Sequence, residues 1–181
     1  MKKAFLLVLI LMVSIISTAC INNLAVQELN VKAKEFMDKG DYESAIGRLK
    51  SSIDLDDSIF ETHYNLGIAY TQAQEYESAV EEFEKALTLK PDADVVHYSL
   101  AVAYENQAKD IINPPVKEDE QIDTDDLEEE EKELSLEDKQ KIVELFNNSV
   151  DSYTKYLEKV NNEDVKAKIE YLQNEITKYS E

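Results

Sequence analysis

The sequence predicts an all-α protein, a helical solenoid of about three helix pairs closed by a C-terminal capping helix. Three observations carry this prediction. Residues of similar size and polarity recur every 34 residues, a period typical of stacked supersecondary units. Between these recurrences, apolar residues lie three and four positions apart, which is the spacing of one face of a helix. The 181 residues include only three glycines and three prolines, too few for a fold built from tight hairpins.

The 34-residue spacing connects aromatic, small and aliphatic positions. Phe36, Tyr70 and Tyr104 share it, and five further pairs follow the same spacing: Tyr42 and Tyr76, Ala45 and Ala79, Leu49 and Phe83, Ile53 and Leu87, Leu55 and Leu89. Chance periodicity in an ordinary helical bundle is the alternative. The number of coincident positions favours true repeats.

The pattern places the first four helices at 24–39, 42–55, 58–73 and 76–89, and a fifth begins after Asp92. Pro91 cannot continue the helix before it, and it favours the start of the next one. The expected sixth helix is displaced, because Ser149 rather than a residue near 113 resembles Ala79 of the preceding pair. We therefore expect an insertion of about 36 residues to divide the third pair.

Two helices are predicted after the insertion. Ser135 and Asp138 resemble a capping box, which starts a helix of about 24 residues. Its apolar positions recur at helical spacing: Ile142, Val143, Phe146, Val150, Tyr153, Leu157 and Val160. A last helix at 163–179 would cover the apolar end of the stack.

The middle unit resembles a tetratricopeptide repeat, a family of antiparallel helix pairs with this period. The matching residues are Asn65-Leu66-Gly67-Ile68-Ala69-Tyr70, then Tyr76, Ala79, Phe83, Ala86-Leu87 and Pro91. His63 stands where the family usually has Trp. The small residues Gly67, Ala79 and Ala86 would let the two helices approach closely.

The same resemblance implies a groove for a peptide or a partner helix, lined by the first helix of each pair. Carrying over the family's groove positions gives nine candidates: Asn30, Lys34, Met37, Tyr64, Ile68, Thr71, Tyr98, Val102 and Glu105. Tyr64 and Tyr98 would stack along this groove, unless they are ordinary exposed aromatics. The family's carboxylate clamp matches only at Asn65, with Lys34 the one basic residue nearby, so binding of chaperone tails is not expected.

The N-terminus resembles the signal of a bacterial lipoprotein. Lys2 and Lys3 precede an apolar run and the small residues 17–19, and Cys20 is the only cysteine. This resemblance implies removal of 1–19, acylation of Cys20, for example by palmitate, and a lipid-anchored position in the cell envelope. An uncleaved membrane anchor and a plain signal peptide are the alternatives. All three put the remaining chain outside the cytoplasm.

The insertion is strongly acidic. Residues 117–133 hold eleven acids and two lysines, so repulsion should keep them solvated and disordered. A variable loop tip is the simplest interpretation, and a dock for a basic partner or weak calcium binding is the alternative. The expected organisation is therefore a leader (1–19), two repeats with the first helix of a third (20–110), the insertion (111–134), and the remaining two helices (135–181).

Composition argues against several functions. Without its leader the chain has 17 basic and 39 acidic residues, a net charge of −22, which repels nucleic acid and anionic headgroups. His63 and His97 are 34 residues apart at a packing position, so we expect structural roles for them rather than a zinc site. No catalytic constellation is recognisable, and neither a metal nor another cofactor is expected.

The predicted function is a membrane-anchored, non-catalytic adaptor or assembly scaffold of the bacterial cell envelope, with proteins or peptides as partners. The alternative is an accessory ligand-binding lipoprotein that uses the acidic loop for cations or basic partners.

Overall fold

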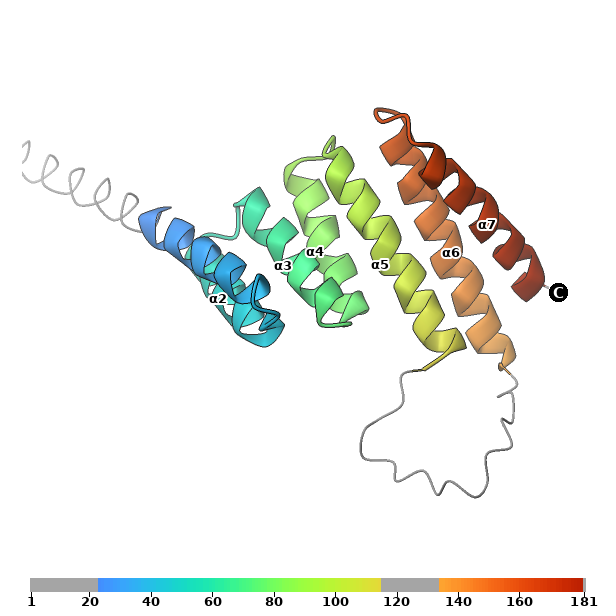
Figure 1. Ribbon diagram of the computed structural model, residues 1–181, viewed down its shortest axis with the longest axis horizontal. Coiled ribbons are helices and arrows are strands. Elements are labelled where there is room, and N and C mark those ends of the chain that lie inside the picture. Colours follow the sequence, from blue (N-terminus) through green and yellow to red (C-terminus); the bar gives the residue numbers. More distant parts are fainter. Residues whose placement is uncertain (1–22, 115–133, 181) are drawn as a thin grey trace, which may run out of the picture. The chain divides into compact units, whose positions relative to one another are not determined.

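The computed structural model describes residues 23–114 and 134–180, and this part of the chain forms helices without strands (Figure 1). A first helix covers 23–37, and six more follow: α2 (Tyr42–Leu55), α3 (Phe60–Gln72), α4 (Tyr76–Leu89), α5 (Asp94–Ile112), α6 (Leu136–Leu157) and α7 (Glu163–Ser180). The predicted all-α fold of helix pairs and a C-terminal helix is confirmed. The predicted leader, Cys20 and the acidic segment 117–133 lie outside the described residues.

The chain divides into two compact units. We call the described residues up to Asp92 the N-terminal unit and those from Ala93 the C-terminal unit. In the first, α3 packs against both α2 and α4; in the second, α6 packs against both α5 and α7. The α5–α6 pair therefore forms across the insertion.

Local signals set the helix boundaries. The carboxylate of Asp41 accepts a hydrogen bond from the Ser44 amide (3.1 Å) and caps α2. The predicted capping box at Ser135 and Asp138 is present and starts α6, which has 22 residues. The side chain of Asn162 accepts hydrogen bonds from two backbone amides in the first turn of α7.

The turns within the first two helix pairs are equivalent. Gly40 and Gln74 are 34 residues apart, and both have a positive φ, 75° and 63°. The next amide in each turn donates to a carbonyl at the matching position, Asp41 to Phe36 and Glu75 to Tyr70, both at 2.9 Å. The repeat is therefore reproduced in backbone geometry as well as in packing.

Small residues allow close helix packing in the N-terminal unit, as the sequence predicted. A Cβ atom added to Gly67 would lie 2.5 Å from the ring of Phe83, which is fully buried on α4. Ala79 and Ala86, on the same helix as Phe83, are also fully buried. Such close approach leaves no space for a larger side chain at position 67.

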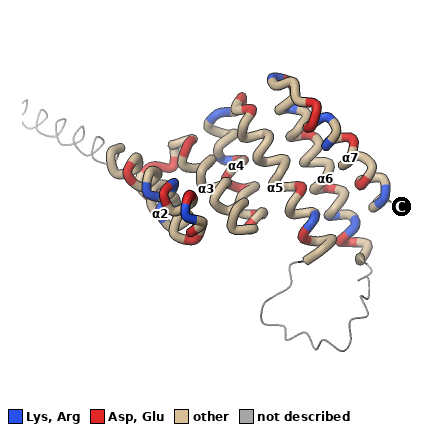
Figure 2. Tube along the Cα trace, viewed as in Figure 1, with Lys and Arg blue, Asp and Glu red and all other residues tan. Residues whose placement is uncertain are grey.

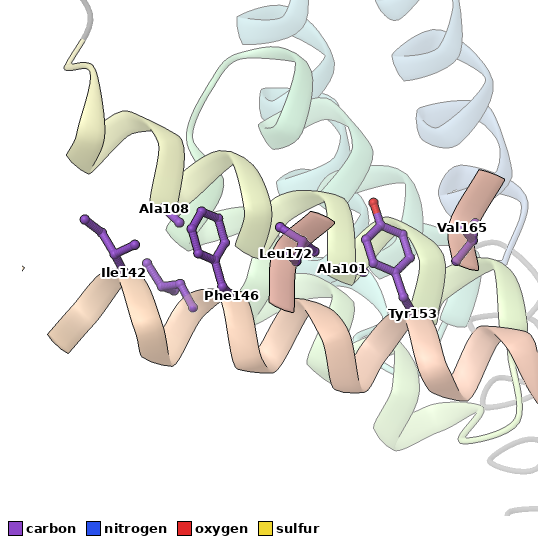
Figure 3. Close-up of a cluster of buried hydrophobic side chains, with 8 residues drawn as sticks. Ala101, Ala108, Ile142, Phe146, Tyr153, Val165 and Leu172 are labelled. Atoms are coloured by element: carbon purple, nitrogen blue, oxygen red, sulfur yellow. The ribbon is translucent and has the colours of Figure 1, made fainter. Parts of the chain in front are cut away.

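The C-terminal unit has one continuous apolar core between α5, α6 and α7 (Figure 3). Its buried members are Ala101, Ala108, Ile142, Leu145, Phe146, Tyr153, Val165 and Leu172. The hydroxyl of Ser149 donates to the carbonyl oxygen of Ala101 (2.8 Å), so α6 lies directly on the backbone of α5. This contact places Ser149 where the period predicted a small residue.

A buried carboxylate joins the three helices of the C-terminal unit. Charges are frequent on α6 and α7 but sparse on α5 (Figure 2), and Glu105 is the buried exception on α5. Its carboxylate accepts hydrogen bonds from the ammonium groups of Lys109 (2.5 Å) and Lys168 (3.0 Å) and from the hydroxyl of Tyr153 (3.3 Å). Burial works to raise the pKa of Glu105, but the two ammonium groups prevail and lower it below its ordinary value of 4.5.

The two helical glycines give opposite predictions for replacement by alanine. Gly67→Ala forces the buried Phe83 ring to move, and we expect a loss of about 1–2 kcal/mol in the free energy of unfolding after the gain in helix propensity is subtracted. Gly47 is exposed within α2, and an added Cβ would meet no atom within 4 Å. Gly47→Ala should therefore stabilise the protein by about 0.5–1 kcal/mol. Denaturant unfolding of both variants measures these changes, and effects of the same sign would contradict the close-packing model.

The ion pairs of Glu105 predict an acid-sensitive C-terminal unit. Because the folded-state pKa is lowered, the stabilisation is present above pH 4.5 and is lost as the pH falls through the lowered value. Glu105→Gln should reduce the free energy of unfolding at neutral pH by about 1–3 kcal/mol and flatten this acid dependence. Glu170→Gln, at an exposed position on α7, is the matched control. An equally steep acid dependence in Glu105→Gln and in the unmodified protein would refute this role.

Candidate functional site

The nine groove candidates fall in both units. Those from 30 to 37 lie on the first helix and those from 64 to 71 on α3, all in the N-terminal unit. The remaining three, from 98 to 105, lie on α5 in the C-terminal unit. The structure therefore presents two surfaces to consider, one in each unit.

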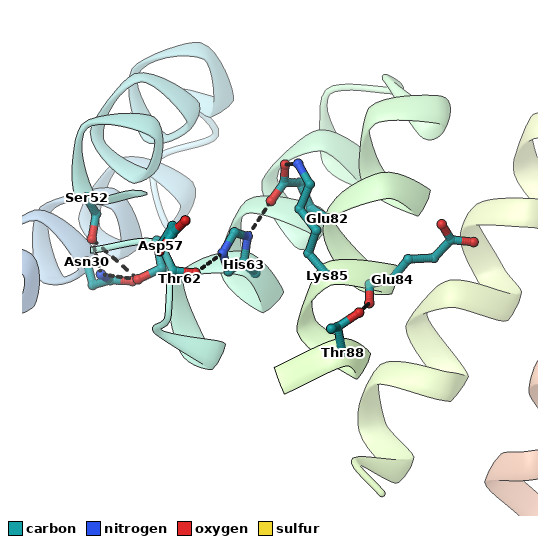
Figure 4. A network of polar contacts seen from close by, with 9 residues as sticks. All are labelled: Asn30, Ser52, Asp57, Thr62, His63, Glu82, Glu84, Lys85 and Thr88. Atoms are coloured by element: carbon teal, nitrogen blue, oxygen red, sulfur yellow. Dashed lines mark hydrogen bonds and ion pairs between the residues drawn. The ribbon is translucent and has the colours of Figure 1, made fainter. Parts of the chain in front are cut away.

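The side chain of Asn30, on the first helix, connects this helix to α2 and α3 by hydrogen bonds, and we call this contact the joint at Asn30 (Figure 4). Its amide group donates hydrogen bonds to the hydroxyl of Ser52 on α2 (3.0 Å) and to that of Thr62 on α3 (2.9 Å). The amide of Asn65 in turn donates to the Asn30 side-chain oxygen (3.4 Å). Asn30 thus fixes how the first helix sits on α2 and α3, and positions 30 and 65 lie side by side.

The surface beside this joint has mixed chemistry. Lys34 is exposed one turn beyond Asn30, and Ile68 is half-buried about one turn beyond Asn65, so both adjoin the Asn30–Asn65 contact. Met37 is also half-buried, and the hydroxyl of Thr71 donates to the Gly67 carbonyl (2.9 Å). We call Lys34, Met37, Ile68 and Thr71 the inner face of the N-terminal unit. It offers a cation and apolar side chains.

Each of the two groove tyrosines packs within its own unit. Tyr64 stacks on Phe60 with ring centroids 6.2 Å apart and lies 6.0 Å from the ring of Phe83. Tyr98 is 40% exposed, and its ring centroid is 5.6 Å from that of Tyr153 and 5.3 Å from that of Tyr156. Both rings are held by neighbouring rings, which gives them defined orientations. That they stack along one groove stays a prediction.

The other two candidates on α5 differ in exposure. Val102 is half-buried against the core of the C-terminal unit. Glu105 is 3% exposed, and its carboxylate is occupied by two lysines and a tyrosine. The structure therefore places Glu105 inside the unit, where it has no free oxygen to offer a partner.

A small cleft opens beside Tyr98. Its volume is about 160 Å³, and it lies between α5, α6 and the first turns of α7. Six residues line it: Tyr98, Tyr153, Asn162, Asp164, Val165 and Lys168. Of these six, only Tyr98 is among the groove residues predicted from the sequence, because the sequence predicts α7 as a capping helix. The sequence Asn162-Glu163-Asp164 was the available signal, since it marks a capped helix start with acidic residues.

His63 is a structural residue, as predicted from its packing position. It is 4% exposed, and its Nδ1 lies 2.7 Å from a carboxylate oxygen of Glu82 while its Nε2 lies 2.8 Å from the carbonyl oxygen of Asp57 (Figure 4). The ammonium of Lys85 donates to the other oxygen of Glu82 (2.7 Å). This network joins α3 to α4 and to the loop before α3, beside an apolar-walled cleft of about 310 Å³ lined by Ile53 and Leu89.

Within 23–114 and 134–180, no cluster of three or more histidine, cysteine, aspartate or glutamate residues has the arrangement of a metal site. None of the helices in the described part of the chain combines the length and apolar character needed to cross a membrane.

Comparison with known proteins identifies the repeats. Residues 33–73 and 67–107 each match the family model described as TPR repeat, the tetratricopeptide repeat. No curated protein matches the sequence.

Solved tetratricopeptide domains share the fold at low sequence identity. The first TPR of Spaghetti (RPAP3), bound to an HSP90 peptide, superposes with a TM-score of 0.61 and 14% identity over 85% of this chain and 94% of that one. The second TPR domain of human RPAP3, in complex with an HSP70 peptide, superposes with a TM-score of 0.60 and 14% identity, over 84% of this chain and 98% of that one. The TPR2B domain of yeast Sti1, in its pHsp70 complex, superposes with a TM-score of 0.52 and 15% identity, over 86% of this chain and 98% of that one. Residues 33–107 of this chain therefore match the tetratricopeptide repeat, within an all-α fold of helix pairs and a C-terminal helix.

Proposed function

We propose that this protein is a lipid-anchored, non-catalytic adaptor that holds or assembles other proteins in the bacterial cell envelope. The observation that carries the proposal is the tetratricopeptide repeat at 33–107. The solved relatives are described as bound to peptides, and the inner face of the N-terminal unit combines Lys34 with the apolar side chains of Met37 and Ile68. An extended segment or a helix of a partner would find both polar and apolar contacts there.

The anchor is proposed from the N-terminal sequence. Cys20 follows three small residues and an apolar run, the pattern of a lipoprotein signal. The described first helix is already present at residue 23, three residues beyond Cys20. An extended chain spans at most about 3.6 Å per residue, so residue 23 would lie within about 11 Å of the Cα atom of Cys20. Stable anchoring needs two signals, which a diacylglyceryl group supplies through its two chains.

Lipidation predicts a specific N-terminal product. The full chain expressed in a bacterial host should incorporate alkyne-labelled palmitate and begin at Cys20 when its N-terminal peptide is analysed by mass spectrometry. Cys20→Ser should lose the label and keep residues 1–19, whereas Ser17→Ala, which retains a small side chain, should behave as the unmodified protein. An unlabelled protein that begins at Met1 would support an uncleaved anchor instead, and one released from the membrane would support a plain signal peptide.

The adaptor role predicts that partners contact the inner face of the N-terminal unit. A photo-reactive benzoylphenylalanine placed at Lys34 or Ile68 should form crosslinked products in living cells, because both positions adjoin the inter-helix joint at Asn30. Matched probes go at Arg48 on α2 and Glu81 on α4, which are exposed on the second helices of the two pairs. These probes should give few products. Crosslinks confined to 48 and 81, or none at any position, would refute the inner face as the partner-binding surface.

A further inference from the structure

We propose that the cleft beside Tyr98 in the C-terminal unit receives a basic side chain, lysine or arginine, of a partner protein. The inference rests on the proposed adaptor function and names a chemical feature of the partner. It is carried by the six lining residues, their burial and the pairing of their charges.

Aromatic rings form one side of the cleft, and they are held in place. Tyr153 is 2% exposed, and its hydroxyl is fixed by the hydrogen bond to Glu105. The ring of Tyr98 contacts the rings of both Tyr153 and Tyr156, yet 40% of the residue remains exposed. An exposed aromatic face attracts cations through its quadrupole, and a rigid ring loses little entropy when a ligand binds.

The charges around the cleft leave a negative group unpaired. Lys168 is paired with Glu105 at 3.0 Å, and Lys109 pairs with the same carboxylate, so Glu105 offsets only one of these two positive charges. Asp164 lines the cleft one helical turn before Lys168, and its carboxylate has no ion pair or side-chain hydrogen bond among the described residues. Its position in the first turn of α7 is favourable for a negative charge, because the positive end of the helix dipole lies there.

A basic side chain fits these groups better than the alternatives do. Its ammonium or guanidinium would pair with Asp164, while its methylene groups would pack against Tyr98 and Val165. An acidic side chain would meet Lys168, whose ammonium is already engaged by Glu105, and it would lie beside the carboxylate of Asp164. The net charge of −20 over the whole chain adds long-range attraction for basic segments and repulsion of acidic ones.

The experiment uses amino-acid amides as probes of the full chain in detergent micelles, with the tyrosine rings labelled with ¹³C. Nα-acetyl-arginine amide and Nα-acetyl-lysine amide should shift the ring signals of Tyr98, which are assigned by their absence in Tyr98→Phe. The uncharged Nα-acetyl-norleucine amide should bind about two- to five-fold more weakly than the lysine probe, as expected for loss of one exposed ion pair and one cation–π contact. Nα-acetyl-glutamate amide should not bind.

Two pairs of variants separate the contributions of charge and ring. Asp164→Asn should weaken arginine binding about two- to five-fold. Glu163→Gln removes the same charge from the same helical turn but outside the cleft, and it should have no effect. Tyr98→Phe keeps the aromatic face and should retain binding, measured on the remaining tyrosine signals, whereas Tyr98→Leu should reduce it.

The outcomes distinguish this inference from the adaptor proposal. Equal binding of the arginine and norleucine probes, tighter binding of the glutamate probe, or equal effects of Asp164→Asn and Glu163→Gln would each overturn the cleft assignment. Partner crosslinks at 34 and 68 would leave the adaptor role standing in that case. Arginine binding that depends on Asp164, in a protein that captures no partner, would instead support the cleft and refute the adaptor.

Discussion

The fold depends on helices that approach closely through small residues. In the N-terminal unit Gly67 leaves room for the fully buried ring of Phe83, and in the C-terminal unit the hydroxyl of Ser149 rests on the backbone oxygen of Ala101. Aromatic rings occupy the space next to these contacts, because a helix pair that lacked them would have a void. The 34-residue period therefore reflects the positions at which a small residue on one helix packs against a large residue on its neighbour.

Buried polar groups add a second constraint, since each must find a partner inside the unit. Asn30 connects three helices, His63 lies between Glu82 and the Asp57 carbonyl, and Glu105 gathers two lysines and a tyrosine. Apolar packing alone tolerates sliding of one helix on another, whereas these hydrogen bonds are satisfied in one register. The hydrogen bonds of Asn30 therefore also fix the geometry of the inner face of the N-terminal unit.

The sequence predicted the helices well because their signals are local. The capping box at Ser135 and the proline before α5 act within a few residues, and the 34-residue period repeats the packing positions of one helix pair in the next. The environment of Glu105 was not predictable in this way. The resemblance to tetratricopeptide repeats places Glu105 among the groove residues, but Lys168 reaches it from 63 residues later in the chain. Periodicity fixes which face of a helix is apolar, and it does not identify a distant polar partner.

The same pair of aromatic rings occurs in both units, but its neighbours differ between them. Tyr64 contacts Phe83, and Tyr98 contacts Tyr153 at equivalent positions, so the same aromatic pair recurs. In the C-terminal unit the second ring carries a hydroxyl that binds Glu105, and α7 brings Asp164 and Lys168 to its edge. These charges on α7 would let a partner distinguish the ring pair of the C-terminal unit from that of the N-terminal unit. This helix covers the core of its unit, and its first turns also supply the charged residues Asp164 and Lys168 beside the ring pair.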